Sequence, residues 1–134
     1  MSLQETYSFL FLSYVVGEGI FLHRYFSHKT YECQPWLAKL FSFLAMLGGF
    51  GTPIGYRAIH ITHHRYSDTD QDLHTPKHGF WHSYITWMFK TRTVSVKTVK
   101  DLRRDPDILF AHRNFLRIFF VTTLIVAFID TNLW

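Results

Sequence analysis

Three apolar runs divide this 134-residue chain, and they limit its possible folds more than any other feature. The runs cover residues 7–22, 36–54 and 115–134, and polar stretches dense in His, Asp, Lys and Arg separate them. Such segregation is typical of a membrane protein, since a soluble domain spreads its apolar residues along amphipathic elements. The length suits a single domain. We therefore expect an all-α fold in which integral membrane helices carry a cytoplasmic, helical, histidine-rich region.

Two of the runs fit membrane-spanning helices. A helix needs about 20 apolar residues to cross the hydrocarbon layer. Residues 3–22 reach that length, with Glu5 at the edge and Glu18 as the one acidic residue farther inside, and residues 115–134 form the other expected span. No basic region precedes the first run and no small-residue cleavage site follows it. It is therefore predicted to be a retained helix rather than a secretory signal.

The middle run, residues 36–55, differs from the other two. Lys39 lies within it, and the segment GGFGTPIG breaks its second half. If this run crossed the bilayer once, the histidines before and after it would lie on opposite sides. A single site built from those histidines requires the run to lie along the interface or to re-enter, and we expect one of these two arrangements.

The basic residues are concentrated in one part of the chain. Eleven of the fourteen Lys and Arg fall between positions 57 and 117. Positive residues beside membrane spans are retained in the cytoplasm, so residues 56–114 are predicted to form a cytoplasmic region. Nucleic-acid binding is the competing interpretation of a pI near 9.3, but the basic residues fit no nucleic-acid motif and alternate with carboxylates. Within this region we expect helices around residues 57–66, 79–90 and 99–113, with a helix start at Asp105-Pro106.

Two histidine motifs flank the middle run. His60, His63 and His64 are spaced by three and four residues, which places their imidazoles on one face of a helix. In HRYFSH, His23 and His28 are five residues apart, and that step rotates a side chain by about 140° on an ideal α-helix. These two rings can converge only if the helix ends or frays between them, so we expect it to end inside this hexapeptide.

Imidazole is a ligand for zinc, copper, iron and nickel. Five histidines without a ligating cysteine disfavour a structural zinc site, and the HExxH spacing of zinc proteases is absent. Either motif alone is also explained as polar decoration of a membrane interface. Together, about thirty residues apart and flanked by apolar runs, they favour a histidine-rich iron site that activates oxygen.

Further polar residues have two interpretations each. Asp68, Asp70 and Asp72 alternate along an expected loop, either as turn-forming residues or as acceptors for the distal N–H of metal-bound histidines. Glu18 is an ionisable residue in an expected membrane helix, which makes it a functional candidate or a neutral residue that points into the protein. Four histidines outside both motifs are expected at the surface or behind the ligands: His74, His78, His82 and His112.

HRYFSH followed by HITHHRYSDTDQDLHTPKHGFW resembles the first two histidine boxes of the membrane fatty-acid desaturases, in particular the delta-9 acyl-CoA and acyl-lipid branch that includes the stearoyl-CoA desaturases. The resemblance implies an oxygen-dependent enzyme that introduces a cis double bond, at the delta-9 position, into a long-chain acyl-CoA or acyl lipid. It also implies a di-iron centre, O2 as co-substrate, and electrons from cytochrome b5 or a ferredoxin with its reductase. The metal ligands it assigns here are His23, His28, His60, His63 and His64, facing the cytoplasm.

The sequence departs from the family pattern at several points. Ile61 replaces the usual arginine, Leu73 a proline, and Tyr84 a histidine; these changes affect substrate contacts rather than ligands. A third box, HxxHH, is absent after His112, and two metals need more ligands than five imidazoles. Residues 1–134 are therefore expected to form one partial desaturase domain. The alternatives are a di-iron membrane hydroxylase or ketolase, which the YSDTD and GFW segments disfavour, and a non-catalytic membrane fragment.

Overall fold

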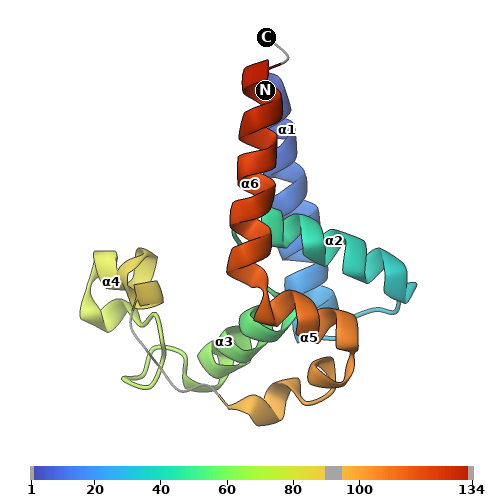
Figure 1. Cartoon of the computed structure of the whole chain (residues 1–134). Coiled ribbons are helices and arrows are strands. Elements are labelled where there is room, and N and C mark those ends of the chain that lie inside the picture. The colour runs from blue at the N-terminus through green and yellow to red at the C-terminus, as the bar shows by residue number, and fades with distance from the viewer. Residues whose placement is uncertain (1, 90–94, 133–134) are drawn as a thin grey trace.

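The computed structural model describes residues 2–89 and 95–132, and every regular element in these ranges is a helix. The expected all-α class is confirmed. Two helical arms extend toward the same end of the molecule, where both chain termini lie, and the shorter helices gather at the opposite end (Figure 1). The small α4 region stands apart to one side (Figure 1).

The N-terminal arm consists of α1 (Leu3–Phe11) and the π-helix η1 (Leu12–Ser27). Ser2 and Glu5 start α1 with a capping box, in which each side chain accepts a hydrogen bond from the backbone N–H of the other. In a π-helix each N–H bonds to the carbonyl five residues earlier. η1 ends at Ser27, and Lys29 adopts a left-handed φ of 53° just beyond it.

Helix α2 (Pro35–Leu47) packs across η1, and this is the largest contact between two elements. Gly17 allows the close approach, because a Cβ atom at this position would lie 2.9 Å from the Cβ and the backbone nitrogen of Ala45. Gly49 and Gly51, with φ of 83° and 90°, then turn the chain. Helix α3 (Pro53–Tyr66) runs back from this turn and starts at Thr52, whose hydroxyl accepts from the Gly55 N–H.

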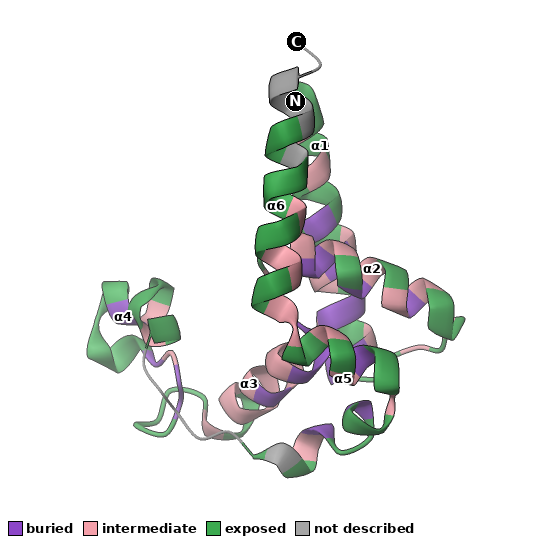
Figure 2. Ribbon diagram, in the orientation of Figure 1, coloured by how far each residue is buried: buried purple, intermediate pink, exposed green. Residues whose placement is uncertain are grey.

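The remaining elements are mostly short. They are η2 (Pro76–His78), α4 (Phe80–Tyr84), η3 (Thr86–Phe89), η4 (Val96–Val99), η5 (Leu102–Arg104), α5 (Pro106–Arg113) and α6 (Phe115–Asn132). The hydrophobic core lies where η1, α2, α3, η4, η5 and α5 meet (Figure 2). Leu22, Ala45 and Val99, at most 1% exposed, are at its centre.

Three helices were expected in the polar region, and one of them is confirmed without change. Residues 57–66 all lie within α3. A single helix over residues 79–90 is wrong: Ile85 leaves helical geometry and separates α4 from η3, and Lys90 lies outside the described residues. Helical residues also occur in three pieces around 99–113, and the helix start expected at Asp105-Pro106 is confirmed. Pro106 disfavours helical geometry in the residue before it, so Asp105 ends the preceding 3-10 turns and caps α5, accepting from the N–H groups of Asp107 and Ile108.

The described helices differ in whether their length and composition fit a membrane span. Within residues 2–89 and 95–132, no single helix is long and apolar enough to cross a bilayer, whereas α5 joined to residues Phe115–Ile125, with a 72° bend between them, meets the length and composition of a span. Helix α2 is apolar but shorter. The spans expected at residues 3–22 and 115–134, and the interfacial or re-entrant placement of residues 36–55, stay predictions.

Candidate metal centre

Four of the five histidines predicted as ligands meet at one point. His23 lies near the end of η1 and His28 directly follows it, whereas His60 and His64 lie on one face of α3. One ring nitrogen of each lies within 4.8 Å of the others. The Nε2 atom of His60 is 2.9 Å from Nε2 of His28 and 3.0 Å from Nε2 of His64. The reversal of the chain between α2 and α3 thus unites the two motifs in a first cluster, defined by these four residues.

The π-helix explains how His23 and His28 converge. The backbone N–H of His28 donates to the carbonyl of His23 over 3.1 Å, and the Ser27 hydroxyl donates to the carbonyl of Leu22 over 2.7 Å. Bonds over five residues bring positions five apart into line, and the centroids of the two imidazole rings are 4.8 Å apart. The helix ends within HRYFSH, as expected, but no fraying is needed between the two histidines.

The first cluster suits a cation better than internal hydrogen bonds. A neutral imidazole has one N–H donor and one acceptor nitrogen. In either tautomer, His60 Nε2 can therefore form a hydrogen bond, as donor or as acceptor, with only one of its two nitrogen neighbours. Burial, followed by the neighbouring imidazoles, lowers the pKa of His60 to about 4, and burial also lowers the pKa of His28. Both rings are thus neutral at pH 7, which is the state that binds metal.

His63, the fifth predicted ligand, belongs to a neighbouring second cluster with Asp72 and His74. Their possible ligand atoms lie within 4.8 Å of one another. His63 Nδ1 is 3.0 Å from Asp72 Oδ1, and its ring stacks on that of His74 with centroids 4.1 Å apart. His74 was expected either at the surface or behind the ligands, and its half-buried position against the His63 ring differs from the surface alternative. No helical spacing could indicate it, because a turn returns the chain to His63.

Asp72 is the buried centre of that turn. Its side chain is 0% exposed and accepts from His63 and from the backbone N–H groups of Asp68 and His74. Burial tends to raise its pKa, but these hydrogen bonds outweigh burial and lower it. The geometry matches an acceptor that orients a ligating histidine. Asp68, with a left-handed φ of 59°, and Asp70 are exposed, which matches their alternative interpretation as turn residues.

Glu18 is connected to the first cluster through a residue that sequence reasoning missed. The Tyr56 hydroxyl donates to Glu18 Oε1, and the Tyr56 ring stacks on His60 with centroids 5.4 Å apart. Burial, then the hydrogen bond to Glu18, raises the pKa of Tyr56. The position of Tyr56, four residues before His60 on a predicted helix, was a usable signal, because that step shares a face.

The other histidines lie outside both clusters. His78 is exposed, whereas His82 is only 5% exposed, so of the two positions expected for His82, at the surface or behind the ligands, the surface is wrong. His112 Nδ1 lies 2.7 Å from the hydroxyl of Thr52, the residue that caps α3. His112 thus joins α5 to the start of the helix that carries the second histidine motif.

The chain is similar to one known protein family over most of its length. Residues 6–134 match the family described as fatty acid desaturase. The chain belongs to the fatty acid desaturase family. The resemblance inferred from the two histidine motifs is therefore confirmed.

Several curated desaturases are similar to this chain. It is 33% identical over 107 residues to the chloroplastic palmitoyl-monogalactosyldiacylglycerol delta-7 desaturase of Arabidopsis thaliana. The matched region covers 76% of this chain and 29% of that protein. It is 32% identical to delta-9 acyl-lipid desaturase 1 of the same plant, covering 75% and 35%, and 35% identical to a probable acyl-CoA desaturase of Schizosaccharomyces pombe, covering 72% and 21%. The chain thus spans about a third or less of these relatives. No solved structure matches it significantly.

The structure shows the surroundings of two residues that depart from the desaturase pattern. Leu73, in place of a proline, is 5% exposed and lies between Asp72 and His74 without disturbing the contact between Asp72 and His63. Tyr84 is 66% exposed and stacks on Phe80. Neither change removes a histidine from the two clusters.

Proposed function

We propose that this chain carries one side of the iron centre of a fatty acyl desaturase. The enzyme would introduce a cis double bond, at the delta-9 position, into a long-chain acyl-CoA or acyl lipid. One observation carries the proposal: four imidazoles from motifs 32 residues apart converge within 4.8 Å, in a chain whose relatives are named as desaturases of acyl lipids and acyl-CoA.

The two clusters have different roles in this proposal. His23, His28, His60 and His64 hold one iron, and their donor set of neutral imidazoles suits Fe(II). His63 donates its Nδ1–H to Asp72, which leaves Nε2 free for a second iron. Tyr56, held by Glu18, keeps the His60 ring in place by stacking on it. Further ligands come from outside this chain's two motifs.

Bound iron supplies the activation of O2 that takes one hydrogen from each of two adjacent methylenes, with two electrons and two protons completing the reduction to two waters. The electrons come from cytochrome b5 or a ferredoxin with its reductase. The residues of this chain hold and orient the ligands; His23 and His60 are half-buried, whereas His28 and His64 are exposed.

The apolar segments support a location in the membrane and a membrane-bound substrate. We propose that residues 3–22 and 115–134 lie in the membrane and that residues 36–55 follow its interface. The basic residues between positions 57 and 117 support a cytoplasmic location of the histidine clusters in this proposal. An acyl chain already in the bilayer then reaches the centre from the membrane side.

Metal content is the direct test. The full chain is purified in detergent, loaded anaerobically with Fe(II), and its bound iron is counted by mass spectrometry. We expect tightly bound iron in the wild-type chain, its loss in His60→Ala, and its retention in His78→Ala, which changes an exposed histidine outside both clusters. Absence of bound iron in the wild-type chain would contradict the proposal and favour the non-catalytic fragment.

The reaction is tested separately by product analysis. The chain is expressed with a reductase and electron donor, with and without a co-expressed downstream segment of a delta-9 acyl-lipid desaturase, and the extracted fatty acids are analysed by gas chromatography. Unsaturated acyl chains that disappear in His60→Ala support the desaturase. Hydroxylated or keto products would instead assign the chain to the alternative class.

A further inference from the structure

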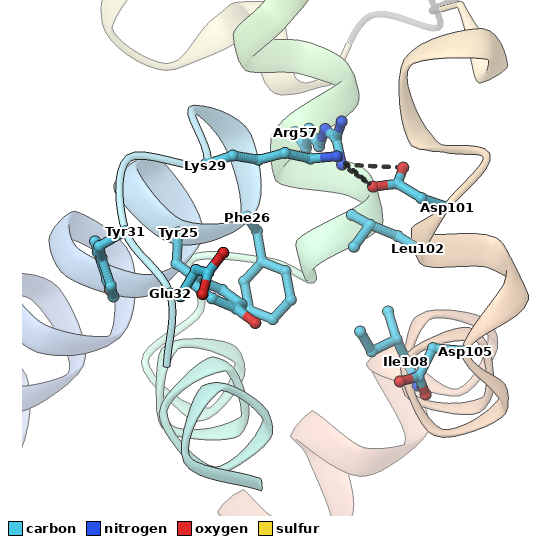
Figure 3. A pocket seen from close by; sticks show the side chains of 10 residues that line it. All are labelled: Tyr25, Phe26, Lys29, Tyr31, Glu32, Arg57, Asp101, Leu102, Asp105 and Ile108. Carbon is cyan, nitrogen blue, oxygen red and sulfur yellow. Dashed lines mark hydrogen bonds and ion pairs between the residues drawn. The ribbon is translucent and has the colours of Figure 1, made fainter. Parts of the chain in front are cut away.

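One carboxylate, that of Asp101, forms ion pairs with a residue close to each of the two histidine motifs. Lys29 and Arg57 both point toward Asp101, which belongs to the turn between η4 and η5 (Figure 3). Lys29 Nζ lies 3.0 Å from Asp101 Oδ2. Arg57 Nη1 donates to both carboxylate oxygens, over 3.0 Å to Oδ1 and 2.8 Å to Oδ2. The three residues line one side of a cavity of about 410 Å³.

Lys29 connects Asp101 to the first motif. It directly follows His28 and has a φ of 53°, a left-handed conformation that is unfavourable for a residue with a side chain. Its backbone N–H donates to the carbonyl of Tyr25, and the next N–H, of Thr30, donates to the carbonyl of Arg24. Lys29 therefore lies at the point where the chain leaves η1, and its ion pair with Asp101 connects that point to the η4–η5 segment.

Arg57 connects Asp101 to the second motif. It lies three residues before His60 on α3, and its side chain is only 12% exposed. A guanidinium at this depth needs a charged acceptor, because an unpaired buried charge is strongly unfavourable. Burial tends to raise the pKa of Asp101, but the hydrogen bonds from Arg57 and Lys29 outweigh it and lower the pKa to about 2.

The segment that carries Asp101 is itself anchored. Val99 is 1% exposed and Leu102 is 9% exposed, and both belong to the core together with Ala58 of α3. The packing of Val99 and Leu102 therefore anchors the backbone on both sides of Asp101. From this segment its carboxylate pairs with both Lys29 and Arg57.

We propose that Asp101 is a positioning residue that sets the separation of the two histidine motifs, so that His28 and His60 approach closely enough to share one metal ion. The proposal rests on the metal site of the proposed function. Asp101 contacts neither histidine and acts through Lys29 and Arg57 alone.

Cobalt binding tests this inference, because Co(II) reports ligand geometry through its visible spectrum. The full chain is titrated with Co(II) in detergent. We expect Asp101→Asn to weaken Co(II) binding about tenfold and to change the visible bands, as alterations behind metal ligands do. Asp101→Glu, which keeps the charge, should recover part of the affinity. Asp107→Asn is the matched control: it breaks an ion pair to Lys39 at a 73% exposed carboxylate, and Lys39 keeps Asp105.

The outcomes separate the two proposals. If the wild-type chain binds no Co(II) or Fe(II), the metal site itself is wrong. If it binds Co(II), and Asp101→Asn keeps both its helical circular dichroism and the wild-type affinity and spectrum, the positioning role is wrong. Should Asp101→Asn fail to fold, Lys29→Met decides, since Lys29 is 60% exposed and its loss breaks only one ion pair. A weakened affinity in that variant supports the inference, and an unchanged affinity overturns it.

Discussion

Asp72 and Asp70 lie two positions apart in the same turn but differ in burial and in hydrogen bonding. Asp72 is fully buried and accepts hydrogen bonds from an imidazole and two backbone N–H groups, whereas Asp70 is exposed. At the scale of single residues, the second cluster therefore depends on one carboxylate that holds the turn closed and His63 in place.

We expect Asp72→Ala to lower the free energy of unfolding by about 2–3 kcal/mol, because two backbone N–H groups and His63 lose their acceptor. Asp70→Ala should stay within about 0.5 kcal/mol of the wild type, as exposed substitutions do. Urea denaturation in detergent measures both values. Equal stabilities of the two variants would show that the turn does not depend on Asp72.

Two substitutions of Tyr56 separate the effect of its hydroxyl group from the effect of its ring, which stacks on His60. Tyr56→Phe removes the hydrogen bond to Glu18 but keeps the ring against His60, so it should lower stability by about 1 kcal/mol and leave Fe(II) binding unchanged. Tyr56→Ala also removes the ring, and we expect it to weaken Fe(II) binding as well. Iron counts and denaturation curves for the two variants test this. A loss of iron in Tyr56→Phe would instead make the hydroxyl part of the metal site.

At the scale of elements, the contact between η1 and α2 determines how closely the first motif approaches the second. Gly17 lies at this contact, and any side chain there meets the backbone of Ala45 rather than a flexible group. The backbone of α2 would have to move away from η1, and the turn leading to α3 would move with it. The close approach of these two helices is therefore a condition for the first cluster.

Gly17→Ala should destabilise the fold by about 1–3 kcal/mol, which is the usual cost of overpacking. Gly19→Ala is the control from the same helix, because the nearest atom to its added Cβ, the Tyr14 carbonyl oxygen, is 3.6 Å away. That change should be neutral or slightly stabilising. Thermal unfolding followed by circular dichroism compares the two, and a neutral Gly17→Ala would show that α2 can shift without cost.

At the scale of the whole molecule, the ion pairs of Asp101 connect η1, α3 and the η4–η5 segment across 44 residues or more of sequence. The pKa of Asp101 is about 2 in the folded chain, below its ordinary value of 3.8. The resulting stabilisation is complete above pH 4 and is lost as the pH falls through about 2, because only the ionised carboxylate pairs with Lys29 and Arg57.

We therefore expect the melting temperature of the wild-type chain to fall between pH 4 and pH 2 more steeply than that of Asp101→Asn, which has no carboxylate to protonate at this position. Scans at several pH values in one detergent measure the difference. The same slope in both proteins would mean that other carboxylates account for the acid sensitivity.

The sequence by itself determined the helical class, the shared face of His60 and His64, the start of α5 at Asp105, and the desaturase family. These features follow from local spacing, from capping preferences and from motifs, all of which are encoded within a few residues. Only the tertiary structure decided that His23 and His28 align through a π-helix, that His74 joins His63, and that Asp101 lies between the two motifs. The reason is physical: these arrangements depend on how η1, α2, α3 and the η4–η5 segment pack together, and contacts between residues 44 positions apart leave no periodic pattern in the chain.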